Sequence, residues 1–264
     1  RFGRFAPGRG GGARRGGGGG RPRLRASAGT AIKEPTFYEN YAGGFALGNP
    51  DLEPERSLGL EAGVEQELAG GRARVSATLF QQRFQDLIQY TFAPATPGGP
   101  NFHNVAEARA RGFELEAWMG AGPLSVTGAW TRLETEVLDA GFDEGPGATF
   151  VEGEALLRRP ANTLAVRAAV ALAGATVSAG ATVVGERADR DFSSWPATPV
   201  ELEGHTDVFM GADLPVLRGQ GGAQRVGLTF RGDNLLDSDH EEAFGFPAPG
   251  RALFVGVRVT FGGP

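Results

Sequence analysis

The sequence predicts an all-β protein that folds as an antiparallel, up-and-down transmembrane β-barrel. Three observations support this fold class. Apolar and polar residues alternate along ten stretches, as they do in strands with one apolar face. No 3.6-residue periodicity persists beyond two turns, so no long helix is expected. Short turns alternate with long loops along the chain, which is typical of the two ends of an outer-membrane barrel.

The ten predicted strands show which face of the sheet is apolar. In the second strand, for example, Leu58, Leu60 and Val64 share one face, while Glu61 and Glu65 share the other. The opposite faces carry Glu, Arg, Thr, Ser, Gly and Ala, which would suit the wet interior of a barrel. A soluble β-sandwich also alternates in this way and remains an alternative. In chain order, the predicted strands are residues 24–31, 57–68, 73–92, 102–119, 123–136, 162–172, 175–187, 205–214, 224–232 and 251–261.

The connections between these strands are of two kinds. The short turns are residues 69–72, 120–123 and 172–175. The long loops are residues 32–56, 93–101, 137–161, 188–204 and 233–250, and the connection at 215–223 is intermediate. The sequence therefore predicts a sheet with a turn end and a loop end.

Composition limits the possible functions. The 264 residues include no Cys, which excludes disulfides, thiolate metal sites and a cysteine nucleophile. No run of about 18 apolar residues is long enough for a membrane-spanning helix, but barrel strands need only ~10 alternating residues each. The first 25 residues hold eight Arg and no acid, so the remaining chain is acidic and is not expected to bind nucleic acid. We expect residues 1–21 to be a disordered Arg/Gly-rich extension and residues 22–264 to form the barrel portion.

Metal sites and catalytic groups are not expected. An acidic cluster surrounds His240, but its spacing fits no EF-hand loop, so it is interpreted as a solvated outer loop. His103, His205 and His240 fall on separate segments without zinc-site spacing. His205 and Asp207 lie near a strand end, as do Asp189 and Asp191, yet no acid–base pair is indicated. The acidic cluster around His240 comprises Asp233, Asp237, Asp239, Glu241 and Glu242. The sequence therefore predicts no catalytic residue, no metal ligand and no cofactor.

Several motifs carry a resemblance to a known family. "RLRASAGTAIKEPTFYENY" (23–41) and "GNPDLEPERSLGLEAGVE" (48–65) resemble the mid-barrel region of TonB-dependent outer-membrane receptors. "NFHNVAEARARGFELEAW" (101–118) is similar to the Asn-x-x-x-Ala-x-x-x-Gly-x-Glu strand of that family, and residues 231–261 resemble its final hairpin. Within the family, "EALLRRPANTL" (154–164) and "RADRDFSSWP" (187–196) look most like the cobalamin (vitamin B12) transporters.

The resemblance implies a fold, a location and an activity. Family members have a 22-stranded barrel, a plug domain and a segment that engages the TonB energy-coupling complex. Against that pattern, we expect this chain to be a C-terminal fragment of about ten strands that lacks the plug. The implied function is active transport across the Gram-negative outer membrane, in contact with lipid, and the ligand is a corrinoid. A ferric siderophore is the alternative ligand, and a self-contained ten-stranded barrel (protease or pore) is the alternative architecture.

The resemblance also implies ligand-contacting residues. The positions that match loop contacts of cobalamin transporters are Arg158, Phe192 and Phe246. Arg158 could pair with amide or phosphate oxygens. Phe192 and Phe246 could pack on a flat macrocycle. The alternative is that these side chains serve only loop packing or an aromatic girdle.

Overall fold

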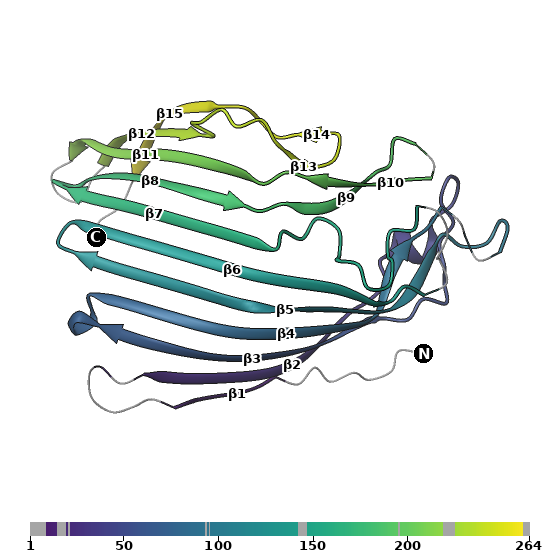
Figure 1. The fold of residues 1–264 in the computed structure, drawn as a ribbon. Coiled ribbons are helices and arrows are strands. Elements are labelled where there is room, and N and C mark those ends of the chain that lie inside the picture. The colour runs from purple at the N-terminus through teal and green to yellow at the C-terminus, as the bar shows by residue number, and fades with distance from the viewer. Residues whose placement is uncertain are drawn as a thin grey trace.

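The computed structural model describes residues 9–14, 20, 22–92, 94, 96–141, 147–194, 196–218 and 225–260. Over these residues the chain forms one curved, eleven-stranded antiparallel sheet in the order β1-β2-β3-β4-β5-β6-β7-β8-β11-β12-β15 (Figure 1). The strands are β1 (Arg9–Arg14), β2 (Arg23–Lys33), β3 (Glu55–Leu68), β4 (Ala73–Tyr90), β5 (Phe102–Ala121), β6 (Leu124–Asp139), β7 (Asn162–Leu172), β8 (Ala175–Val184), β11 (His205–Arg218), β12 (Arg225–Asp233) and β15 (Ala252–Thr260). The predicted all-β, up-and-down architecture is confirmed.

Each of the ten predicted strands has a counterpart in the sheet, from β2 onward. The largest differences lie at strand ends: β6 continues to Asp139 and β11 to Arg218. The strand predicted over 175–187 ends already at Val184, where the backbone N–H of Gly185 turns to donate to the carbonyl of Asn162 at 2.9 Å. Alternation therefore predicts the central part of each strand, but not the residue at which the strand ends.

The described part of the predicted extension includes a strand, Arg9–Arg14. These residues form β1 and pair antiparallel with β2, with Arg9 opposite Gly29 and Arg14 opposite Leu24. The physical reason is that the outer edge of β2 offers a row of backbone donors and acceptors, which even a glycine-rich segment can satisfy. The rest of the predicted extension, residues 1–8, 15–19 and 21, lies outside the described residues.

The long loops contain short elements that the sequence did not predict. A one-turn helix, α1 (Phe37–Tyr41), begins with a capping box in which Thr36 and Glu39 exchange hydrogen bonds. One loop folds into the hairpin β9 (Arg187–Asp191) and β10 (Thr198–Leu202), and another into β13 (Glu241–Ala243) and β14 (Phe246–Pro247). A single 3₁₀ turn, η1 (Ala69–Gly71), closes the connection between β3 and β4. No helix among the described residues is long and apolar enough to cross a membrane.

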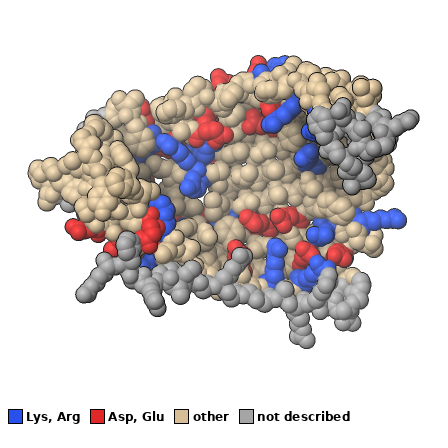
Figure 2. All heavy atoms as spheres, turned by 180° about the vertical axis from the view of Figure 1, so that it is seen from behind, with Lys and Arg blue, Asp and Glu red and all other residues tan. Residues whose placement is uncertain are grey.

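The two faces of the sheet differ in chemistry, as the alternation predicts. One face exposes a continuous apolar surface, to which Leu58, Leu60 and Val64 of β3 belong. The opposite face carries charged pairs, for example Arg23 Nη1 with Glu65 Oε1 at 3.0 Å. Figure 2 shows Arg, Asp and Glu side chains gathered on that face, where the sheet is hollowed. Such a sheet has an apolar outside and a polar inside.

The described residues form one layer of sheet, with buried apolar side chains only in small groups near the loop end. Ala108, Ala110 and Val137 are buried there, beneath the loop that follows β6. A sandwich needs a second layer sealed against the apolar face, and the part of the chain described here shows none. Pairing also runs from β1 to β15 without joining these two strands. The described strands are therefore neither a sandwich nor a self-contained closed barrel.

Two asparagines at the start of β5 fasten the loop that carries α1. The backbone N–H of Asn101 donates to the Leu47 carbonyl at 2.8 Å, and the Asn101 Oδ1 accepts from the Leu47 N–H at 2.8 Å. Asn104 likewise exchanges two hydrogen bonds of 2.8 Å with the backbone of Glu53. Because these amide side chains imitate a strand backbone, the loop is held against β5 as an extra strand would be.

Candidate functional site

The loop end of the sheet is joined at one buried carboxylate, that of Asp189 in β9. Its Oδ1 accepts from Arg158 Nε at 2.9 Å and from the backbone N–H of Arg190 at 2.8 Å. Its Oδ2 accepts from the backbone N–H of Phe244 at 2.8 Å. The Asp189 side chain is fully buried, and a buried charge is tolerated only when it is paired and hydrogen-bonded in this way. Asp189 thereby joins three loop segments.

Two buried arginines of β9 extend this junction. Arg187 Nη2 donates to the Glu241 carbonyl at 2.6 Å and to Glu242 Oε2 at 3.2 Å. Arg190 Nη2 lies 3.6 Å from Glu154 Oε2, in the loop after β6. The hairpin β9–β10 is therefore fastened on one side to the loop before β7 and on the other to the loop before β15.

The loop from residue 233 to residue 250 is shaped by two polar side chains. Asn234, at φ 46°, accepts from the Ser238 N–H at 2.8 Å and donates to the Ser238 carbonyl at 2.9 Å. Asp237 Oδ1 accepts from the Arg251 N–H at 2.9 Å, and Asp237 Oδ2 lies 3.3 Å from the Arg251 guanidinium. That backbone N–H and the guanidinium charge hold the pKa of Asp237 below its ordinary value. The "DNLLD" turn thus folds the loop back over β11.

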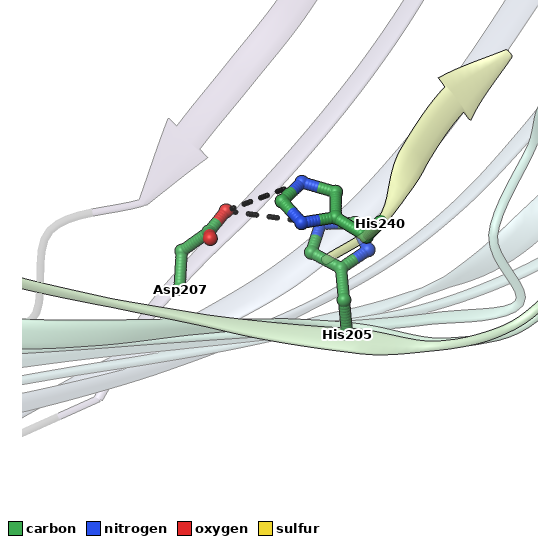
Figure 3. Close-up of side chains that lie close together, drawn as sticks. All are labelled: His205, Asp207 and His240. Carbon is green, nitrogen blue, oxygen red and sulfur yellow. Dashed lines mark ion pairs between the residues drawn. The ribbon is translucent and has the colours of Figure 1, made fainter. Parts of the chain in front are cut away.

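This folding brings two histidines together. His205, the first residue of β11, and His240, from the loop, stack with ring centroids 3.7 Å apart and an angle of 11° between their planes. Figure 3 shows Asp207 facing both rings from β11. The two Nε2 atoms lie 3.8 Å and 3.9 Å from Asp207 Oδ2, and at the same two distances from Glu242 Oε1. Two imidazoles and two carboxylates therefore meet at the loop end.

The sequence-predicted residues occupy different parts of this end. Arg158, at φ 58°, donates its backbone N–H to the Ala188 carbonyl at 2.8 Å, and its side chain is 43% exposed. Phe192 is 46% exposed and Phe246 is 72% exposed. Through Asp189, Arg158 meets the backbone of Phe244, close in sequence to Phe246. Among the described residues, no hydrogen bond, ion pair or ring contact joins Phe192 to the other two.

The sequence did not predict the roles of Asp189 and of the histidine pair. The His-x-Asp spacing of His205 and Asp207 does put both side chains on one face of a strand, so half of the cluster could have been recognised. His240 comes from a loop that alternation does not describe. The acidic segment around His240 was predicted to be solvated. Its Glu242 side chain is exposed, but the His240 side chain is buried.

Comparisons with known proteins agree with this geometry. Residues 21–235 match the family described as "TonB dependent receptor-like, beta-barrel". A relative from Vibrio cholerae serotype O1, the vitamin B12 transporter BtuB, is 27% identical over 90% of this chain and 34% of its own length. The chain thus spans about a third of the length of the curated relatives it matches.

Solved structures show the same fold. The pyoverdine outer membrane receptor FpvA from Pseudomonas aeruginosa PAO1 superposes with a TM-score of 0.66 at 17% identity, covering 91% of this chain and 34% of that one. The ferric-catecholate import receptor Fiu from Escherichia coli K12 gives a TM-score of 0.64 at 17% identity, covering 89% and 32%. At such identities the likeness is one of fold. The family match covers most of the chain, and the partial barrel with its apolar outer face fits that family. The chain therefore belongs to the TonB-dependent receptor β-barrel family of outer-membrane proteins.

Proposed function

We propose that this chain supplies barrel strands and ligand-contacting outer loops to a TonB-dependent transporter that imports a corrinoid across the outer membrane. The family consists of receptors and transporters, and the proposal includes no catalytic step. In it, the apolar face of the sheet lies against lipid and the polar face lines the interior. The loops bind the ligand, and the TonB energy-coupling complex drives its release inward.

The observation that supports a corrinoid most directly is the likeness to the vitamin B12 transporter, which extends over 90% of the chain. The loop end adds chemistry of the right kind. Phe192 and Phe246 expose aromatic rings that can lie on a flat macrocycle. The guanidinium of Arg158 uses its Nε for Asp189, and its exposed part is left to face amide or phosphate oxygens.

A ferric siderophore is the second candidate. The superposed structures include receptors for pyoverdine and for ferric catecholates. Their identity to this chain is 17%, so they support the fold that the two ligand classes share rather than the siderophore itself. The corrinoid stays the first proposal.

Ligand binding tests the proposal. The protein as it occurs in the outer membrane, purified in detergent, should bind cyanocobalamin, and Phe246→Ala should weaken that binding about tenfold or more through lost stacking. Phe230→Ala, on the lipid-facing side of β12, is the matched control and should leave binding unchanged. Equilibrium titration by fluorescence or calorimetry measures both variants.

The outcomes separate the two ligands. Binding of ferric siderophores with no binding of cyanocobalamin would overturn the corrinoid proposal. An unchanged affinity in both Phe246→Ala and Phe192→Ala would assign these rings to loop packing.

A further inference from the structure

We propose that His205, Asp207, His240 and Glu242 form a binding site for a divalent transition-metal ion such as Zn²⁺. The site joins β11 to the loop of residues 233–250, on the inner face of the sheet at its loop end (Figure 3). It stands independently of the corrinoid proposal, because it rests on the geometry of these four side chains alone.

The four facing atoms alternate between nitrogen and oxygen. Each imidazole Nε2 lies 3.8–3.9 Å from Asp207 Oδ2 and from Glu242 Oε1. The facing atoms of His205, Asp207 and His240 all lie within 4.8 Å of one another. Around a tetrahedral zinc with bonds of ~2.0–2.1 Å, neighbouring ligand atoms lie ~3.3 Å apart. To hold an ion, the four nitrogen–oxygen separations would have to shorten by about half an ångström each. The stacked rings would also have to tilt, so that the lone pairs of both Nε2 atoms point at the ion.

The distances between the imidazole nitrogens and the carboxylate oxygens also show that no direct hydrogen bonds join these groups. At 3.8–3.9 Å the imidazoles and carboxylates are too far apart for direct hydrogen bonds. The His205 side chain is only 3% exposed and that of His240 only 7%. In addition, His205 Nδ1 and Asp207 Oδ1 are buried atoms without a hydrogen-bond partner. Buried polar groups without such partners are costly. An ion between the Nε2 atoms and the carboxylates would give a partner to the facing atoms Nε2, Oδ2 and Oε1, and it would still leave His205 Nδ1 and Asp207 Oδ1 without one.

Neighbouring groups orient the two ligands that come from the loop, His240 and Glu242. His240 Nδ1 lies 3.3 Å from the Ser238 carbonyl, and an N–H placed there leaves the Nε2 lone pair free to face the carboxylates. Arg187 holds the other oxygen of Glu242, Oε2, at 3.2 Å and so presents Oε1 to the two rings. Both ligands from the loop are therefore held by a further contact.

The chemistry of the donors selects the class of ion. Imidazole nitrogen suits Zn²⁺, Cu²⁺ and Ni²⁺, whereas Ca²⁺ and Mg²⁺ take oxygen ligands. With no Cys in the chain, thiolate sites for softer ions are excluded. Since the ligands come from a strand and from a distant loop, a bound ion would fix that loop against the sheet.

Metal titration tests the site. The detergent-purified outer-membrane protein, stripped with chelator and free of corrinoid, should bind one Co²⁺ with a visible absorption spectrum, and Zn²⁺ should displace it. His205→Gln or His240→Gln should each weaken Zn²⁺ binding by more than ~100-fold, because losing even an outer partner of a ligand costs roughly 10–100-fold. His103→Gln is the matched control, since His103 is the remaining histidine of the chain and lies at the start of β5.

A second measurement uses the unaltered protein, so its result does not depend on whether a variant folds. Cu²⁺ bound to the unaltered protein should give an electron paramagnetic resonance spectrum with coupling to two imidazole nitrogens. Absence of Co²⁺ and Zn²⁺ binding, a spectrum with fewer than two nitrogens, or equal Zn²⁺ affinity in the His205→Gln and His103→Gln proteins would overturn the site. Zn²⁺ binding in a protein that binds no cyanocobalamin would support the site while the corrinoid proposal fails.

Discussion

The sheet and the loop end are held together by different interactions. Each strand is fixed by a backbone ladder, to which cross-strand pairs such as Arg23 with Glu65 add. The loop end is instead fixed by polar side chains that bind backbone groups: Asp189 binds Phe244, Asn234 binds Pro249 and Asn104 binds Glu53. We therefore expect the strands to tolerate exchange of similar side chains and the loop end to depend on single residues.

Among the changes that test this contrast between strands and loop end, Asp189→Ala is expected to lower stability the most. The change leaves Arg158 Nε and the backbone N–H groups of Arg190 and Phe244 without their acceptor. Each buried donor that is left unpaired costs about 1–3 kcal/mol. Hydrogen exchange of the purified protein should show lost protection in the three joined loops and unchanged protection in β3–β8. Glu186→Ala, which removes an exposed acid nearby, is the control. Equal loss in strands and loops would contradict the contrast.

An intermediate effect is expected within the sheet, from Gly112→Ala in β5. A Cβ there would lie 2.0 Å from the Arg132 carbonyl oxygen and 2.9 Å from the Phe80 ring. Such overpacking costs roughly 1–3 kcal/mol and should lower the urea midpoint of barrel unfolding. Gly128→Ala is the control, because its nearest atom would be 3.8 Å away. If both variants unfold at the same midpoint, the close approach at Gly112 has no energetic consequence.

The smallest effect is expected from pH at Asp237. Its lowered pKa means that its contribution to stability is present above the ordinary carboxyl pKa and is lost as pH falls through the lower folded value. Protection factors of the loop 233–250 should therefore drop in acid, while those of β12 should not. In Asp237→Asn this acid step should disappear. An acid step of the same size in that variant would assign the effect to another group.

The sequence predicted the sheet well because alternation is a local signal. Leu58, Leu60 and Val64 reveal their shared face without knowledge of the neighbouring strands. It did not predict β9, because Arg187 and Asp189 are buried charges whose partners lie in other loops. Nor could spacing show that His240 stacks on His205, since the "DNLLD" turn first has to fold the loop back. The predicted site residues Arg158, Phe192 and Phe246 came from family resemblance, and their role in binding stays a prediction.

The Asp189 junction has a mechanical consequence. The segments that carry Arg158 and Phe244 are both bound to the carboxylate of Asp189 in β9, so one side chain couples the two loops. A movement of β9 would therefore be transmitted to both of them.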